Sequence, residues 1–275
     1  MPRNITYLTE DKQEISVSVS GEPGDNKPAI VIVHGFKGFK DWGFFPYTAG
    51  HLSSLGFFVL TFNFSHNGIG EIPDQFTEEE KFAENTISRE IKELTELTGA
   101  LRNGYFDGIK PGKVGILGHS RGGGISILSS PAILPECLVT WSSVAGFDRY
   151  TERQKKEWRK NGYTIVTNSR TGQEFKMNLR YLEDVEKHKN GKHSFEKSLQ
   201  NYKNPFLIIH GSEDLTVKKE EAEKIYEWSD KNETDLETVD KAGHTFNCIH
   251  PFAGSNPQFE KVLKLTGDFF TKNLK

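Results

Sequence analysis

The feature that most constrains how this chain can fold is the stretch Gly115–Gly124, which reads Gly-Ile-Leu-Gly-His-Ser-Arg-Gly-Gly-Gly. Apolar residues from Val114 to Leu117 predict a buried strand that stops at Gly118, and the small and apolar residues after Ser120 predict a helix. Gly118–Gly122 matches G-x-S-x-G. This motif forms a strand-to-helix turn so tight that only glycine fits two residues before and two residues after the serine. Such a turn would raise the Ser120 hydroxyl above the sheet edge, beside the positive end of the helix.

The pentapeptide by itself leaves an alternative open. Glycine and serine are common, so Ser120 could be an ordinary N-cap residue at a joint between a strand and a helix. What favours a nucleophile is the strand before it, the helix after it and the presence of partners further along the chain.

Apolar, β-branched runs alternate with helical patterns through most of the sequence. We predict strands at Ala29–Val33, Phe57–Asn63, Val114–Leu117, Cys137–Trp141, Phe206–Ile209 and Leu236–Val239. We predict helices at Trp42–Leu55, at Thr86–Leu101, from Ser120 to near Pro131, at Lys218–Trp228 and at Pro257–Leu274. This alternation indicates βαβ units and a mostly parallel sheet, with Ile5–Leu8 and Glu14–Ser20 as an antiparallel hairpin at its edge.

The residue pattern changes from Asp148 to Lys203, where no apolar run long enough for a buried strand occurs. From Arg149 onward this segment holds fourteen basic and seven acidic residues. We expect a cap or lid of about 148–203, inserted into a single domain of 275 residues. Its predicted hairpin has the arms Tyr163–Val166 and Glu174–Met177, with a turn at Arg170–Gln173. The positive charge would suit anionic substrates, although a solvated outer surface explains it too.

Three residues carry the chemistry that we predict. A serine hydroxyl needs a base within hydrogen-bond reach, and the histidine that serves it needs a carboxylate to orient the ring. Ser120, Asp214 and His244 occur in the order Ser…Asp…His, and each follows a predicted strand. The three loops should therefore meet at one edge of the sheet.

Other residues compete for two of these roles. Glu213 and Asp148 are the alternative acids, but Asp214 has the better offset from its strand. The alternative bases are less well placed than His244. His210 precedes the acid, His66 lies in an early polar loop, and His250 lies beyond the turn that Ala242-Gly243-His244 would form.

The oxyanion of an acyl-transfer reaction needs two N–H donors. We assign the backbone N–H of Phe36, which follows a strand and Gly35, and that of Arg121, which follows the nucleophile. We expect further substrate contacts from His34, Gly35 and His119.

Composition excludes several classes of function. A net charge of −3 gives no case for nucleic acid or an anionic membrane, and Cys137 and Cys248 are too few for a disulfide framework. We expect no metal and no organic cofactor; Gly68-Ile69-Gly70 lacks the third glycine of a dinucleotide site. The first residues show no signal-peptide core, so we expect a cytoplasmic protein, a monomer or a homodimer.

Together these motifs resemble the α/β-hydrolase superfamily, in its dienelactone-hydrolase-like and cinnamoyl (feruloyl) esterase-like branch. The resemblance is carried by 34–36, 62–64, 67–70, 118–123, 210–214 and 242–244. It implies an eight-stranded, mostly parallel sheet with helices on both faces, a cap after the sixth strand and an acyl-enzyme mechanism. Dienelactone hydrolases proper are similar but have a cysteine nucleophile where this chain has Ser120.

The expected activity is therefore that of a serine carboxylesterase that cleaves a small-molecule ester with a small or medium acyl group, which could be aromatic. A serine peptidase or amidase acting on short peptides and a thioesterase remain alternatives, because the same triad serves both. A non-catalytic ligand-binding relative is disfavoured, because no triad member is missing.

Overall fold

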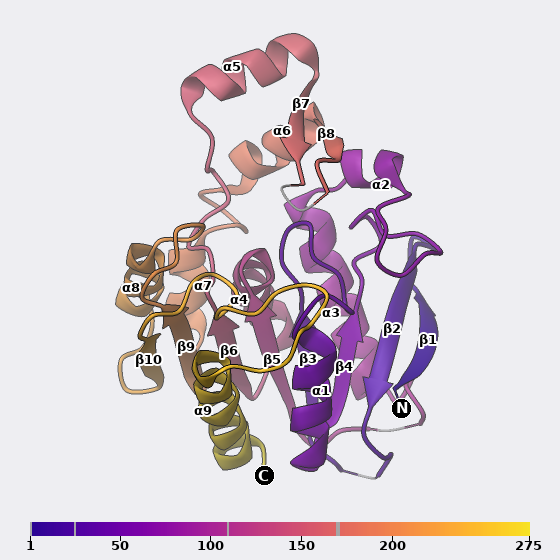
Figure 1. The fold of residues 1–275 in the computed structure, drawn as a ribbon, viewed down its shortest axis with the longest axis vertical. Helices are drawn as coiled ribbons and strands as arrows, with labels where there is room; N and C mark the ends of the chain where they lie inside the picture. Colours follow the sequence, from indigo (N-terminus) through magenta and orange to yellow (C-terminus); the bar gives the residue numbers. More distant parts are fainter. Residues whose placement is uncertain (1, 25, 109, 169–170) are drawn as a thin grey trace.

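A twisted eight-stranded sheet runs through the computed structural model, which describes residues 2–24, 26–108, 110–168 and 171–275 (Figure 1). The strand order is β1-β2-β4-β3-β5-β6-β9-β10. The strands are β1 (Arg3–Leu8), β2 (Glu14–Ser20), β3 (Ala29–Val33), β4 (Phe58–Phe62), β5 (Val114–His119), β6 (Cys137–Trp141), β9 (Phe206–Gly211) and β10 (Thr234–Val239). β2 pairs antiparallel with β1 and with β4, and every other pairing is parallel.

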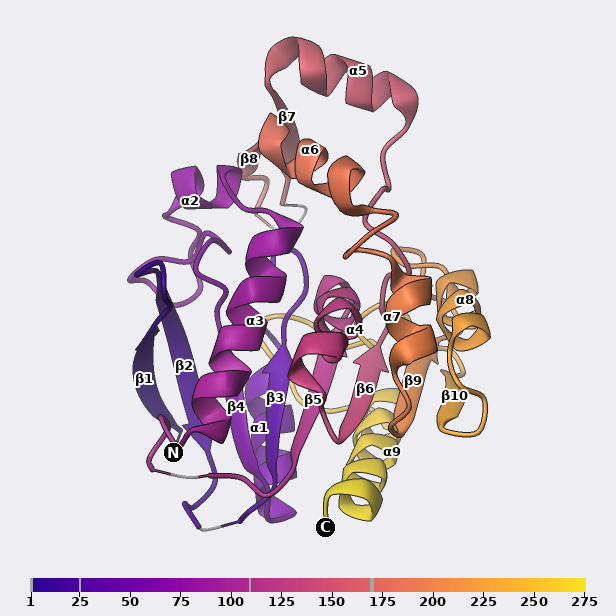
Figure 2. The same cartoon turned by 180° about the vertical axis from the view of Figure 1, so that it is seen from behind.

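Helices cover both faces of the sheet. On one face lie α1 (Phe45–Ser54) and α9 (Pro257–Leu274), which stand in front of the strands in Figure 1. On the other lie α3 (Ile87–Arg102), α4 (Arg121–Ile133), α7 (Phe195–Asn201) and α8 (Lys219–Trp228), as Figure 2 shows. A hydrophobic core lies on each face of the sheet, and β3 contributes side chains to both. Ile30 and Ile32 pack on the α9 side, and Val31 and Val33 on the α3 side. The predicted α/β-hydrolase fold is confirmed.

The segment 148–203, called the insertion below, leaves the sheet after β6 and returns at β9. It contains α5 (Glu152–Asn161), the antiparallel pair β7 (Tyr163–Thr167) and β8 (Glu174–Asn178), and α6 (Leu179–His188). These elements stand beyond the edge where β3, β5 and β6 end, next to the short helix α2 (Glu79–Ala83) (Figures 1 and 2). Its last helix, α7, instead packs beside the sheet, between α4 and α8. Of the predicted hairpin turn, Arg170 lies outside the described residues.

Two helix boundaries differ from the prediction by more than one residue, both for local reasons. α1 begins at Phe45 rather than Trp42, with Pro46 in its first turn, where the missing N–H costs no hydrogen bond. α4 runs past Pro131 to Ile133. Proline cannot donate to the carbonyl of Ile127, but the Ser130 hydroxyl does so at 2.8 Å, which keeps this acceptor bonded.

The described helices include none that is long and apolar enough to cross a membrane. Cys137 and Cys248 are both buried, and neither takes part in a disulfide.

Candidate active site

Ser120 lies at the tip of the turn between β5 and α4, with φ at 57°. Such a positive φ is rare outside glycine and marks a backbone held in place by its surroundings. A Cβ on Gly118 would lie 2.5 Å from the carbonyl oxygen of Gly122, and one on Gly122 would meet the carbonyls of Val33 and His34. The Ser120 side chain makes no capping bond to α4. Ser120 thus occupies the N-cap position of α4, but its hydroxyl does not cap the helix.

The structure brings His244 and Asp214 to Ser120. His244 Nε2 lies 3.0 Å from Ser120 Oγ, and His244 Nδ1 lies 2.8 Å from Asp214 Oδ2. The other oxygen of Asp214 accepts hydrogen bonds from the N–H groups of Thr216 and Val217, each at 2.9 Å. Burial raises the pKa of Asp214, but the bond to His244 and the two N–H donors outweigh it and hold the pKa below its usual value. The carboxylate therefore stays ionised beside the imidazole.

The competing acids lie elsewhere. Asp148 pairs with Lys155 at 2.6 Å and with Lys189 at 3.2 Å, within the insertion. Glu213 is exposed next to Asp214, which is itself buried.

The competing bases are also engaged. His210 Nε2 lies 2.8 Å from the carbonyl oxygen of Val217 and 3.4 Å from Asp214 Oδ2, so this ring supports the acid from behind. His250 Nδ1 accepts from the N–H of Gly43 at 2.9 Å. Of the three alternative histidines, none takes the place of His244 at Ser120.

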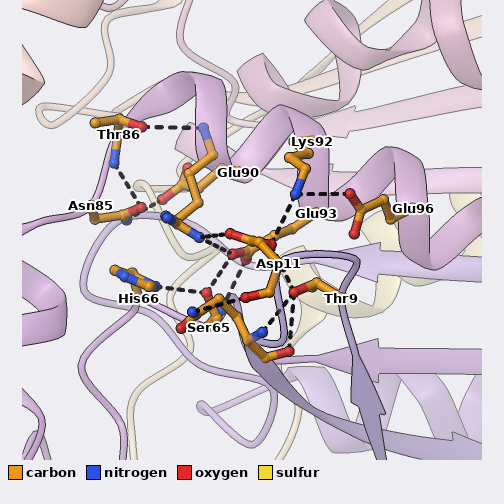
Figure 3. A network of polar contacts seen from close by, with 12 residues as sticks. Thr9, Asp11, Ser65, His66, Asn85, Thr86, Glu90, Lys92, Glu93 and Glu96 are labelled. Atoms are coloured by element: carbon orange, nitrogen blue, oxygen red, sulfur yellow. Dashed lines mark hydrogen bonds and ion pairs between the residues drawn. The ribbon is translucent and has the colours of Figure 1, made fainter.

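His66 belongs to a separate buried network (Figure 3). Its Nδ1 lies 2.7 Å from Ser65 Oγ, and that hydroxyl also donates to Glu93. Burial raises the pKa of Glu93 to about 7 and lowers that of His66 to about 4. Glu93 and Glu90 come from one face of α3, and Figure 3 shows how both reach into this polar layer.

The loop after β3 lies against Ser120. A Cβ on Gly35 would be 3.0 Å from Ser120 Cβ and 3.1 Å from the carbonyl oxygen of His119, so a side chain here would crowd Ser120. The peptide that follows carries the N–H of Phe36. Arg121 is the first residue of α4, and its N–H therefore has no acceptor within the helix. Both predicted oxyanion donors thus belong to segments that adjoin Ser120.

The predicted substrate contacts divide into two groups. Gly35 and His119 line a cleft of ≈ 210 Å³ together with Ser120 and His244, which we call the histidine-side cleft. His34 is buried behind it; its Nε2 accepts from the N–H of Phe64 at 3.3 Å, and its Nδ1 lies 2.9 Å from the Gly35 carbonyl. The structure therefore corrects the expectation for His34, which packs behind the loop that contains Gly35 rather than facing the cleft.

A second cleft, of ≈ 280 Å³, opens on the other side of Ser120. We call it the arginine-side cleft. It is lined by Phe36, Ser120, Arg121, Phe147, Arg149 and Tyr181, among others. His244 is not among its lining residues, so Ser120 lines both clefts and His244 only the first.

The side chain of Arg121 is a feature that the sequence reasoning missed. It is 6 % exposed, its Nε donates to Glu90 Oε2 at 2.9 Å, and its Cζ lies 5.1 Å from the rings of both Phe36 and Tyr181. The signal was present in α3, where Glu90 stands between Ile87 and Leu94 within the apolar stripe. A carboxylate in such a stripe must find a buried partner.

Comparisons with known proteins place the chain in a family. A profile of the dienelactone hydrolase family matches residues 16–274. The chain belongs to that family. The protein is therefore a hydrolase with an α/β-hydrolase fold. No protein with a curated description matches the chain.

Solved structures similar to this member of the dienelactone hydrolase family include Est1E from Butyrivibrio proteoclasticus, with a TM-score of 0.70, 14% identity and 98% of each chain covered. The esterase domain of a Rhodothermus marinus protein has a TM-score of 0.67 and 15% identity over 100% of both chains. A monoacylglycerol lipase from Paleococcus ferrophilus has a TM-score of 0.69 and 15% identity, covering 94% of this chain and 99% of its own. At these identities the likeness establishes the fold.

Proposed function

We propose that this hydrolase is a serine carboxylesterase in which Ser120, His244 and Asp214 form the catalytic triad. The observation that carries the proposal is the unbroken chain of contacts from Ser120 Oγ through both nitrogens of His244 to Asp214, at 3.0 and 2.8 Å. The turn that carries Ser120 supports the proposal as well. An added Cβ on Gly118 or Gly122 would overlap the neighbouring backbone, so the tight turn fixes the position of the hydroxyl.

The reaction then follows from the positions of these groups. His244 takes the hydroxyl proton of Ser120 as the oxygen attacks the ester carbonyl, and Asp214 stabilises the imidazolium. The N–H groups of Phe36 and Arg121 bind the oxyanion, each lowering the barrier by about 3 kcal/mol. His244 then gives the proton to the departing alcohol. In the second step His244 takes a proton from water as the water attacks the acyl-enzyme, and the acid is released from Ser120 as its hydroxyl re-forms.

An ester is the favoured substrate because several structures with a similar fold are those of ester-cleaving enzymes. Two of the similar structures are an esterase domain and a monoacylglycerol lipase, and Est1E has been solved with ferulic acid bound. We also propose that the insertion serves as a cap, since Tyr181 of α6 and Asn168 line the two clefts beside Ser120.

The direct test is a panel of p-nitrophenyl esters of rising acyl length, together with a feruloyl ester, assayed with the wild-type chain and with Ser120→Ala. We expect ester hydrolysis that falls by at least about a thousandfold in the variant. An aminoacyl nitroanilide assayed beside the panel separates a peptidase from an esterase. Turnover that survives Ser120→Ala would reject the proposed nucleophile.

A further inference from the structure

Two clefts meet at Ser120, and the position of the base assigns each a part of the substrate. The leaving alcohol must accept its proton from His244 Nε2, so it departs through the cleft that His244 lines. The oxyanion occupies the donors between the clefts. The remaining substituent of the carbonyl carbon, the acyl chain, is then directed into the arginine-side cleft. This assignment rests on the proposed serine esterase function.

The arginine-side cleft combines aromatic walls with cationic donors. Phe147, Tyr150 and Tyr181 line it, and so do Arg121 and Arg149; among the described residues that line it, none carries a carboxylate. An alkyl chain alone would not require a buried guanidinium in its pocket, because a charge in such a place costs desolvation free energy.

Arg121 has hydrogen-bonding capacity to spare. Only its Nε bonds to Glu90, and its Nη2 has no hydrogen-bond partner within the described part of the chain, although the side chain is 6 % exposed. A buried guanidinium N–H left unpaired is unfavourable, and an oxygen of a bound ligand is the natural acceptor.

The carboxylates that balance the two arginines lie behind them and are shared with other donors. Glu90 also accepts from Asn85 Nδ2 at 2.7 Å. Glu221, which bonds Arg149 at 2.6 Å, also accepts from the N–H of Ala145 at 2.8 Å. Neither carboxylate lines the cleft, so the side facing the acyl chain presents donors without a competing negative charge.

We propose that the arginine-side cleft selects acyl groups that end in a carboxylate, which makes half-esters of dicarboxylic acids the preferred substrate class. Arg121 binds the terminal carboxylate, Arg149 adds attraction at the cleft mouth, and the aromatic walls hold the methylene chain. Arg121 Nε remains with Glu90, which orients the guanidinium.

The test compares kcat/KM on three ethyl esters of equal chain length. They are the monoethyl ester of adipic acid, the matching ester in which a primary amide replaces the free carboxylate, and the one in which an isopropyl group does. All three release ethanol, so they differ only at the far end of the acyl chain. We expect the wild-type chain to prefer the carboxylate over the amide by at least about tenfold.

The variants then locate the preference. In Arg121→Gln/Glu90→Gln, which removes both charges together and leaves no unpaired carboxylate, we expect the preference to fall about tenfold. Arg149→Gln should lower it about threefold, because this side chain is partly exposed. Arg153→Gln is the matched control: that side chain is 88% exposed on α5, and its substitution should leave the preference unchanged. Circular dichroism and thermal unfolding verify the fold of each variant.

If the double variant does not fold, Arg121→Lys replaces it. This variant keeps the charge opposite Glu90 but loses the guanidinium fork, and it should lower the preference at least about threefold.

Two failures are distinguishable. Hydrolysis of all three esters at similar rates, or a preference that persists in the arginine variants, overturns the carboxylate selectivity and leaves the esterase function standing. Hydrolysis of none of them, together with none of the p-nitrophenyl esters, overturns the esterase function and this inference with it.

Discussion

His244 Nε2 lies 3.0 Å from Ser120 Oγ, although 124 residues separate the two along the chain. Each residue sits in a loop that follows a parallel strand, and parallel strands end at one edge of the sheet. The sheet therefore brings together a hydroxyl and an imidazole that no local interaction could place side by side. The functional predictions follow from this geometry and from the contacts around it.

Asp214→Asn should reduce kcat by about ten thousandfold with little change in KM, because an amide at this position cannot hold the productive tautomer of His244. Steady-state kinetics on a p-nitrophenyl ester measures this. Glu213→Gln and Asp148→Asn are the controls, since the first residue is exposed and the second pairs with lysines. A large loss of activity in either control, with Asp214→Asn active, would place the acid elsewhere.

Gly118→Ala should destabilise the fold by about 3 kcal/mol or prevent folding, because the new methyl group would overlap the backbone of the nucleophile turn. The matched control is Gly50→Ala. Gly50 lies inside α1 with nothing within 4 Å of an added Cβ. There alanine should stabilise the protein by about 0.5–1 kcal/mol through its helix propensity. Urea unfolding of the two variants checks both signs, and equal stability in the pair would contradict the tight turn.

Two buried histidines should make the protein less stable as the pH falls below about 6.5. Burial lowers the pKa of His34 to about 4 and that of His119 to about 3. Unfolded histidine takes up its proton near pH 6.5, so each of these residues lowers the free energy of unfolding by about 1.4 kcal/mol per pH unit as the pH falls from there toward its folded pKa.

Glu93 acts in the opposite sense. Its folded pKa is raised to about 7 from the usual 4.5, so the folded state takes up this proton first and gains stability as the pH falls between these values. Glu93→Gln removes that gain, and urea unfolding of the variant across this range should show a steeper loss of stability with acid. A slope equal to that of the wild type would contradict the buried, protonated carboxyl.

The insertion is fastened to α3 by Asp184. Its two oxygens accept from the N–H of Ser88 at 2.9 Å and from the Ser88 hydroxyl at 2.5 Å. Asp184→Ala should increase amide hydrogen exchange in α6 about tenfold, because one buried charged contact across the interface is lost. Glu183→Ala, its exposed neighbour, should leave exchange unchanged. Identical exchange in the two variants would show that Asp184 does not fasten the insertion.

Sequence patterns predicted most of the fold because its strands are continuous apolar runs with clear breaks. The predicted strand Cys137–Trp141, for example, coincides with β6. The helices α2, α5, α6 and α7 were not predicted as individual elements, and α2 and α7 are the shortest of them. Each of these two owes its stability to packing, α7 against α4 and α8, and α2 against β8.

The site was predictable only in part. The order of Ser120, Asp214 and His244 and their distances from the preceding strands predicted that the three lie together, because parallel strands end at one edge of the sheet. The pairing of Arg121 with Glu90, and the way His34 braces the Phe64 backbone, depend on side-chain directions in three dimensions. The place of Glu90 within an apolar stripe indicates that it has a buried partner, but spacing along the chain does not tell which residue that partner is.

The central claim, that Ser120 is the nucleophile, is tested most directly by labelling the wild-type chain with a fluorophosphonate and locating the adduct by peptide mass spectrometry. The Ser120 oxygen should displace fluoride, and esterase activity should disappear in proportion to the one modified peptide, while Ser120→Ala and His244→Gln should take up no label. Stoichiometric inactivation with the adduct on any other residue, or full activity after Ser120 is labelled, would contradict the account.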